Sequence, residues 1–99
     1  MMPALTAKQI SLRLRAVPSW SKRAQTIVRM YKFEGFPAGI DFVNRIARKA
    51  QKINHHPDIN IRFDKVTLKL TTHDEGGITG KDFTLARQCD LVLSKFFAP

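Results

Sequence analysis

The hydrophobic period of the sequence changes near its middle, and this change limits the folds that the chain can adopt. Apolar residues recur at three- and four-residue steps over residues 38–53, which predicts a long amphipathic helix. Two alternating runs follow, at residues 59–63 and 66–70, and Asp64-Lys65 between them is a turn candidate, so two antiparallel strands are predicted. The helical stripe consists of Ile40, Val43, Ile46, Ala47, Ala50 and Ile53. A chain with both periods needs helices packed on a sheet.

Two further elements are predicted ahead of the long helix. Thr6 and Gln9 form a capping-box pair, so a first helix should begin at Ala7, and Pro18 should end it. Residues 26–33 alternate between two faces and are rich in β-branched and aromatic side chains, which predicts a strand.

The end of the sequence predicts a third helix. Thr79 and Asp82 form a second capping-box-like pair ahead of apolar residues at helical spacing. A short extra strand is predicted around residues 20–22, and Trp20, the single tryptophan, is expected in the core rather than in the wall of a pocket. We therefore predict an α+β fold, with a small antiparallel sheet and helices packed on one of its faces.

Length and cysteine content exclude several classes of protein. A chain of 99 residues has room for one domain, so we treat residues 1–99 as a single unit and expect self-association to supplement its small core. Cys89 is alone, which excludes an intrachain disulfide and a cysteine zinc cluster and favours a reducing compartment. No apolar run approaches the roughly 18 residues that a membrane span needs.

The positive charge is concentrated in the first half of the chain. Residues 1–52 carry eleven Lys and Arg against two acidic residues, a net +9, whereas residues 53–99 carry six against six. Such a field attracts nucleic acid, anionic membranes or phosphorylated partners, although a solvated helix face is the simpler interpretation. The stretch ahead of Glu34 also has no acidic residue and in this respect resembles an organellar transit peptide.

Three histidines lie where predicted elements end. His55-His56-Pro57 follows the long helix, and His73 follows the second strand of the hairpin. Imidazole exchanges protons near neutral pH, so histidines clustered in loops indicate acid–base chemistry, with Asp82 as a further member. Each also has a structural explanation: a polar helix end for the histidines and a capping partner for Asp82. A three-histidine metal site is another alternative, but the spacing matches no common metal motif.

These residues carry a family resemblance. The run Gln51-x3-His55-His56-Pro57-x5-Phe63-x9-His73-x8-Asp82 resembles the signature of the pterin-4a-carbinolamine dehydratases, also known in animals as dimerisation cofactors of a hepatocyte nuclear transcription factor. The resemblance covers roughly residues 5–95 and includes Trp20, Phe33, Phe36, Ala38, Phe42, the segment 66–73, Gly76-Gly77-Ile78-Thr79, Phe83, Leu85 and Ala86.

The resemblance implies a fold and a reaction. The fold would be a four-stranded antiparallel sheet backed by three helices, and the reaction would remove water from 4a-hydroxytetrahydrobiopterin to give quinonoid dihydrobiopterin, in tetrahydrobiopterin recycling. The resemblance further implies a homodimer or homotetramer, no metal or organic cofactor and a pathway link to aromatic amino acid hydroxylases. The single cysteine and the absence of a convincing targeting signal predict a cytoplasmic location, with a nuclear one open. The resemblance implies neither a nucleic-acid nor a membrane partner.

The resemblance also assigns site residues. Catalytic roles fall to His55, His56, His73 and Asp82, and substrate binding falls to Asn54, His55, His56, Pro57, Thr71, Thr72, His73 and Asp74. The sequence does not say which histidine is acid and which is base. One departure is Gln51, because the family usually has an acidic residue there, and a neutral amide cannot raise a histidine pKa as a carboxylate does.

Two alternatives remain open from the sequence. The fold could serve as a non-catalytic dimerisation or binding module that uses its basic helix face. It could also be a pterin-binding protein in another pathway, such as molybdopterin metabolism.

Overall fold

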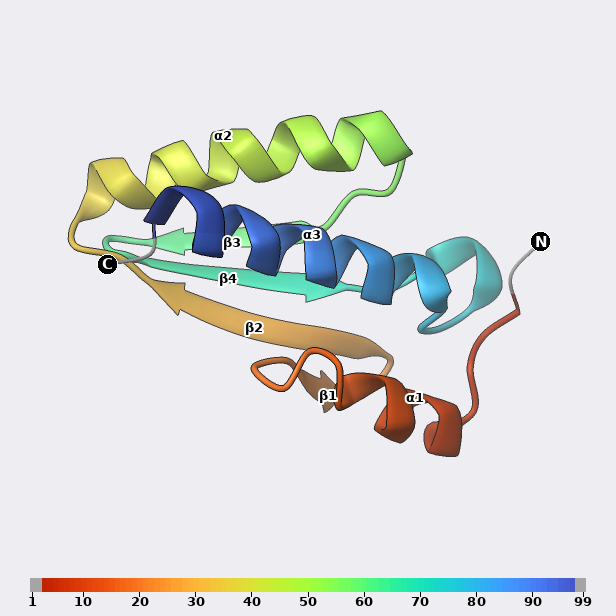
Figure 1. The fold of residues 1–99 in the computed structure, drawn as a ribbon. Coiled ribbons are helices and arrows are strands. Elements are labelled where there is room, and N and C mark those ends of the chain that lie inside the picture. The colour runs from red at the N-terminus through yellow and green to blue at the C-terminus, as the bar shows by residue number, and fades with distance from the viewer. Residues whose placement is uncertain (1–2, 98–99) are drawn as a thin grey trace.

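The computed structural model describes residues 3–97 and has the predicted α+β architecture (Figure 1). A four-stranded antiparallel sheet and three α-helices are present in this part of the chain, which confirms the fold class. The elements are α1 (Ala7–Leu14), β1 (Ser21–Arg23), β2 (Thr26–Lys32), α2 (Phe36–Ile53), β3 (Asp58–Arg62), β4 (Lys65–Leu70), the short 3-10 helix η1 (His73–Glu75) and α3 (Gly80–Phe97). No helix of residues 3–97 has the length and apolarity needed to cross a bilayer.

The sheet has the strand order β1-β2-β4-β3, with each neighbouring pair antiparallel. In its centre Ile27 lies opposite Leu70 and Tyr31 opposite Val66, and all four side chains are buried. The helices α2 and α3 run side by side in opposite directions along this apolar face (Figure 1). The other face carries side chains such as Lys69 and the half-buried Thr67, as expected for a sheet covered on one side.

Aromatic side chains form the centre of the core. The Phe42 ring of α2 is fully buried, with its centroid 4.6 Å from that of Tyr31 and 5.0 Å from that of Phe33. Trp20 is buried as predicted, and its indole N–H donates to the Asp90 carboxylate at 3.0 Å. Asp90 also accepts from the Tyr31 hydroxyl at 2.6 Å, so this carboxylate ties β2 to α3.

The structure corrects the predicted stripe of α2. The buried side of α2 contains Gly39, Phe42, Ile46 and Ala50, whereas Ala47 and Ile53, both predicted in the stripe, are exposed. Gly39 faces the sheet, where a Cβ built on it would lie in ordinary van der Waals contact with Val66, at 3.4 Å. The apolar stripe is therefore rotated toward Phe42.

Some predicted boundaries also differ. The first helix ends at Leu14, ahead of the predicted Pro18, and its last residues continue as turns. The hairpin turn lies at Phe63-Asp64, one residue before the predicted Asp64-Lys65. Phe63 was expected in the strand, but its φ of 52° is left-handed and its side chain is 72% exposed.

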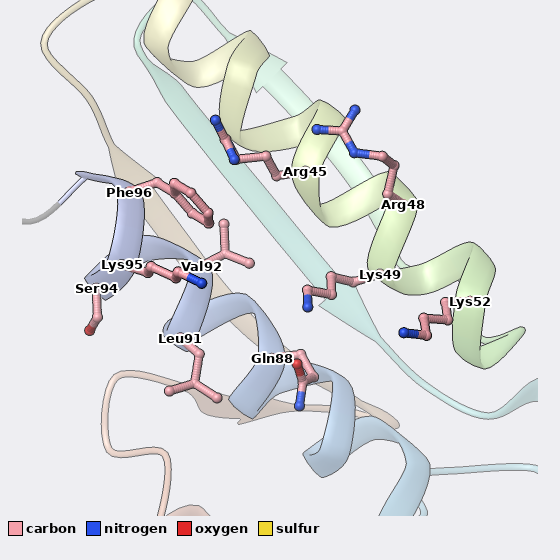
Figure 2. A pocket seen from close by; sticks show the side chains of 10 residues that line it. All are labelled: Arg45, Arg48, Lys49, Lys52, Gln88, Leu91, Val92, Ser94, Lys95 and Phe96. Carbon is pink, nitrogen blue, oxygen red and sulfur yellow. The ribbon is translucent and has the colours of Figure 1, made fainter.

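A groove separates the outer surfaces of α2 and α3 (Figure 2). Its volume is about 640 Å³, and none of the predicted site residues lines it. Its side chains are Arg45, Arg48, Lys49, Lys52, Gln88, Leu91, Val92, Ser94, Lys95 and Phe96, and we call it the α2–α3 groove.

Candidate active site

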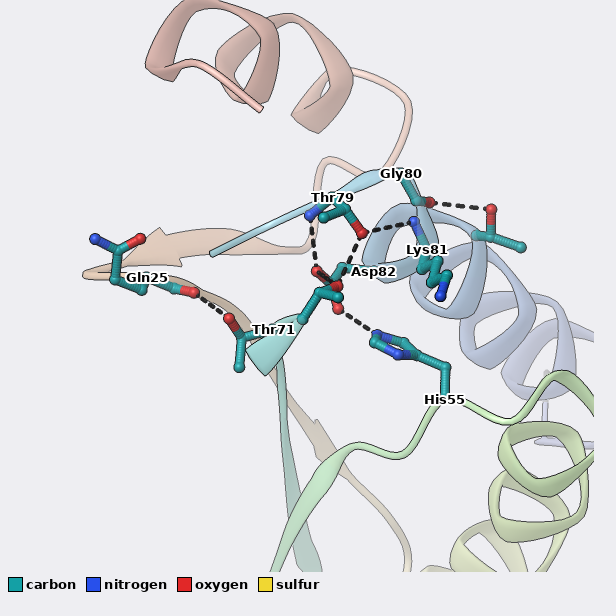
Figure 3. Close-up of polar contacts among 9 residues, drawn as sticks. Gln25, His55, Thr71, Thr79, Gly80, Lys81 and Asp82 are labelled. Atoms are coloured by element: carbon teal, nitrogen blue, oxygen red, sulfur yellow. Dashed lines mark hydrogen bonds and ion pairs between the residues drawn. The ribbon is translucent and has the colours of Figure 1, made fainter. Parts of the chain in front are cut away.

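The end of α2 places His55. Asn54 adopts a left-handed conformation with φ 54° and ψ 44°, and its N–H donates to the Ala50 and Gln51 carbonyls. The His55 N–H donates to the Ala50 carbonyl at 3.1 Å, which completes the cap. Asparagine tolerates this conformation better than most residues with a side chain. The chain therefore turns sharply after α2, and the His55 ring points toward the start of α3 (Figure 3).

Asp82, in the first turn of α3, is the partner of His55. Its carboxylate is fully buried, and Oδ1 lies 2.6 Å from His55 Nε2. Oδ2 accepts from the Thr72 hydroxyl at 2.9 Å and from the Thr79 backbone N–H at 2.9 Å. A buried carboxylate is stable only when such donors replace water, and here three donors come from three different segments.

The hydrogen bonds determine which atom of His55 is free. Thr72 has one hydroxyl proton, which Asp82 accepts, so the Thr79 hydroxyl donates to Thr72 Oγ1 at 2.8 Å. A carboxylate that accepts from all its neighbours has no proton to donate, so His55 Nε2 carries the hydrogen in this contact. His55 Nδ1 is then the ring nitrogen left for proton exchange.

His73 lies close to this network but stands on the surface. It opens η1 directly after Thr72, and its side chain is exposed. The loop is closed by a Thr72–Gly77 backbone pair, with N–H to carbonyl distances of 3.0 and 3.3 Å. Gly76 turns the chain with a φ of 71°, a conformation that favours glycine. The loop thus holds His73 next to Thr72, whose hydroxyl donates a hydrogen bond to Asp82.

The second histidine of the pair faces another group. His56 is exposed, and its Nε2 donates to the Gln51 side-chain carbonyl at 3.0 Å. The departure seen in the sequence therefore bears directly on His56, because an amide rather than a carboxylate meets its ring. Pro57, half-buried, follows and leads into β3.

The other predicted binding residues take different positions. The Thr71 hydroxyl donates to the Gln25 carbonyl at 2.6 Å, which ties the end of β4 to the β1–β2 turn (Figure 3). Asp74 is exposed in η1, and Thr72 is buried against Asp82. Direct hydrogen bonds thus join His55, Thr72 and Asp82, but they do not bring Thr71 or Asp74 to the same point.

Thr79 belongs to this network although it was predicted only as a helix cap. Its N–H does bond to Asp82, as the capping spacing predicts, but its hydroxyl accepts from the Lys81 N–H and donates to Thr72. The position of Thr79 three residues before Asp82 was the available signal. No group of three or more His, Cys, Asp or Glu side chains within residues 3–97 is arranged to hold a metal ion.

The fold agrees with that of known proteins that the chain resembles. The model of the pterin 4 alpha carbinolamine dehydratase family matches residues 3–92. The chain therefore belongs to this family.

Relatives match over nearly their whole length. A protein of Acidobacterium capsulatum named "Putative pterin-4-alpha-carbinolamine dehydratase" is 46% identical over 92 residues, which cover 93% of this chain and 100% of that one. A protein of the same name from a Picosynechococcus species is 48% identical over 90 residues, covering 91% and 98%. The crystal structure of a transcriptional coactivator/pterin dehydratase from Brucella melitensis superimposes with a TM-score of 0.86 at 32% identity, covering 90% of this chain and 97% of that one.

Proposed function

We propose that the protein removes water from a 4a-hydroxytetrahydropterin, with 4a-hydroxytetrahydrobiopterin as the substrate and quinonoid dihydrobiopterin as the product. The observation that carries this proposal is the contact between His55 and the buried Asp82, in a chain of this family. A role in tetrahydrobiopterin recycling follows from that reaction.

The reaction needs two proton transfers. The C4a–O bond breaks, and the leaving hydroxide takes a proton and departs as water. The N5 lone pair forms the C4a=N5 double bond, and the N5 proton passes to a base. The dehydration moves no net electrons, so its chemistry calls for acid–base groups rather than a redox cofactor.

The three histidines supply these groups. His55 exchanges its proton at Nδ1, because Asp82 holds the opposite nitrogen. Asp82 is buried beneath His55 and orients the ring, and it stabilises the imidazolium that forms when Nδ1 takes a proton. His56 and His73 are exposed, and in this proposal they provide the second proton transfer. The remaining predicted binding residues flank the histidines in the sequence and contribute to pterin binding; they are Asn54, Pro57, Thr71 and Asp74. Thr72 acts through Asp82.

The experiment is a stopped-flow assay with freshly generated 4a-hydroxytetrahydropterin, in which absorbance follows the quinonoid product. The native protein should accelerate dehydration over the uncatalysed reaction, and His55→Ala and His73→Ala should each slow it by at least about 100-fold. Lys22→Ala, on the exposed strand β1, is the matched control. Acceleration that survives in both histidine variants would remove their assigned roles. A native protein that does not accelerate the reaction would remove the enzyme assignment.

We also propose a homodimer or homotetramer. β3 is an edge strand whose five residues are all exposed, and Ile59 and Ile61 on it are apolar. Edge strands with apolar side chains pair readily with other chains. Light scattering coupled to size-exclusion chromatography measures the assembly, and a monomer at micromolar concentration would refute it. The hydroxylase link remains a prediction from the family resemblance, and the cytoplasmic or nuclear location remains a prediction from the sequence.

A further inference from the structure

A second hollow lies on the open face of the sheet, beside the turn between β3 and β4. Its volume is about 580 Å³, which is within the size range of small-molecule sites. Its side chains are Met30, Asn60, Arg62, Phe63, Lys65 and Thr67, and we call it the hairpin hollow. The predicted site residues lie at the other end of the same strands, because β3 follows Pro57 and β4 precedes Thr71. A strand as long as β3 spans about 17 Å, so the hairpin hollow is separate from the candidate active site.

The floor of the hairpin hollow is one row of residues across three strands. Met30 of β2 lies opposite Thr67 of β4, and Thr67 lies opposite Asn60 of β3. The residues next to this row, Tyr31 and Val66, are buried, so the row itself faces away from the helices. The Met30 side chain is 52% exposed. The floor therefore offers an apolar surface beside an amide and a hydroxyl.

Phe63 is the least expected residue of the hairpin hollow. Its φ of 52° is left-handed, a conformation that is unusual for a bulky side chain. Its ring is 72% exposed, so packing within this chain does not explain why a phenylalanine occupies the turn. Residues held in such conformations concentrate at functional sites, where binding rather than folding determines the side chain.

The next row toward the turn is cationic. Lys32, Lys65 and Arg62 lie opposite one another on β2, β4 and β3. Like charges that face each other across strands destabilise a sheet. Asp64 Oδ1 lies 3.3 Å from Lys65 Nζ, whereas Arg62 has no ion pair with another residue of 3–97. A bound anion would relieve the repulsion within this row.

We propose that the hairpin hollow binds a nucleotide, that is, a planar base carried on a sugar phosphate. The phosphate contacts Arg62 and Lys65, because a guanidinium forms two parallel hydrogen bonds to such an anion. The base stacks on the Phe63 ring, a contact that is available to every base. Asn60 and Thr67 donate and accept hydrogen bonds at the edge of the base or at the sugar hydroxyls. The proposal is independent of the proposed dehydration.

The charge pattern favours a single nucleotide over a nucleic-acid strand. On the far side of the floor, Lys69 lies opposite Asp58, and their charges cancel. The cations that line the hairpin hollow, Arg62 and Lys65, thus stand at one end of it, next to Phe63. A phosphodiester backbone would need a groove of cations that continues along its length.

The test is a titration of nitrogen-labelled protein followed by two-dimensional amide NMR. The probes are the four common ribonucleoside 5′-monophosphates, with the matching nucleosides and inorganic phosphate as controls. At least one nucleotide should bind with a Kd below about 1 mM and shift the amides of the β3–β4 turn. It should bind at least about tenfold more tightly than its nucleoside and than inorganic phosphate, because the site contacts both the base and the phosphate.

Variants separate the hairpin hollow from the general charge and from the active site. Arg62→Gln and Phe63→Gly should each weaken nucleotide binding by at least about tenfold, whereas Arg23→Gln on the exposed strand β1 should leave it within about twofold. Glycine adopts the left-handed turn readily, so Phe63→Gly should be at least as stable as the native protein in urea unfolding. Arg62→Gln should keep the native dehydration rate, and His55→Ala should keep native nucleotide binding.

Several results would overturn the proposal. One is the absence of any saturable shift up to about 1 mM nucleotide. Others are shifts centred on His55 rather than on the turn, and inorganic phosphate that binds as tightly as the nucleotide. An oligothymidylate that binds more than about tenfold more tightly than every mononucleotide would assign the surface to a strand. Finally, a smaller assembly of Phe63→Gly in light scattering would show that a second copy of the chain covers this ring.

Discussion

His55 and Asp82 are separated by 27 positions in the chain, yet His55 Nε2 and Asp82 Oδ1 lie 2.6 Å apart. The contact joins the residue that follows α2 to the first turn of α3, and the His55 side chain is only 11% exposed. Asp82 has no exposed surface, so in the proposed reaction its carboxylate would act through the ring of His55 rather than directly.

Asp82→Asn should impair both stability and dehydration. An amide offers one accepting oxygen where the carboxylate offers two, so one of its three donors loses its partner. We expect unfolding free energy to fall by about 1–3 kcal/mol and dehydration to slow by at least about 100-fold. Urea unfolding and the stopped-flow assay measure these effects, with the exposed Asp58→Asn as control. Native activity in a folded Asp82→Asn variant would contradict the orienting role.

Thr72→Val should lower stability because it removes a hydroxyl with two buried hydrogen bonds. Its loss leaves Asp82 with one donor fewer and Thr79 without an acceptor for its hydroxyl. We expect a cost of about 1–3 kcal/mol in urea unfolding. Thr72→Ser keeps the hydroxyl, so most of this loss of stability should be absent in the serine variant. Thr67→Val, on the open face of the sheet, is the comparison, and an equal cost at both positions would argue against the network.

Asn54 should respond to substitution according to its backbone conformation. Its φ of 54° and ψ of 44° lie in the left-handed region, and this conformation costs an alanine residue about 1 kcal/mol. Asn54→Ala should therefore destabilise the protein by about 1 kcal/mol, whereas Asn54→Gly should stay within about 0.5 kcal/mol of native. Thermal or urea unfolding checks the difference. If glycine costs as much as alanine, the asparagine side chain rather than the turn is responsible.

Stability should fall in alkali between about pH 9 and pH 12. Burial, reinforced by Asp90, raises the pKa of the Cys89 thiol from 9.0 to about 12. Burial and the hydrogen bond to Asp90 likewise raise the pKa of the Tyr31 hydroxyl above its usual range. Each group is protonated in the folded protein while its unfolded counterpart ionises. The stability that each group contributes is complete below its pKa in the unfolded chain, and it is lost as the pH rises toward its pKa in the folded protein.

The measurement is the free energy of urea unfolding at several pH values between about 9 and 12. The native protein should lose more than about 1 kcal/mol as the pH rises, and Cys89→Ala should show a smaller loss. Lysine titration affects both proteins alike, so the difference between their slopes isolates the thiol. Parallel slopes would show that Cys89 does not contribute.

Local periodicity predicted the elements of this fold well, but it did not predict every position within them. The long helix and the hairpin have strong patterns because each side chain faces either the core or water. Phe63 was predicted in a strand because it continues the alternation of residues 59–63, yet the turn geometry places it at a left-handed position in solvent. Phe42 was left out of the predicted stripe, although it lies at helical spacing from Ile46 and Ala50 and its ring packs against Phe97 in the core.

The site was predictable in its residue types but not in its connections. The histidines and Asp82 were predicted as site residues because their spacings resemble a family signature. The bond from Thr72 to Asp82 crosses ten positions and depends on how η1 returns the chain to α3. Thr72 was predicted to line a pterin pocket, but it is buried, and its hydroxyl bonds to Asp82. Contacts of this kind follow from tertiary structure and leave little trace in local sequence.

The network beneath His55 has a consequence for the energy of the reaction. Thr79, Thr72 and Asp82 are closed off from water, and their hydrogen bonds are complete within the fold. Solvent dipoles therefore need not rearrange around Asp82 when charge develops on the imidazole. Folding itself preorganises the electrostatic environment, which would lower the reorganisation energy of the proton transfers that we propose at His55.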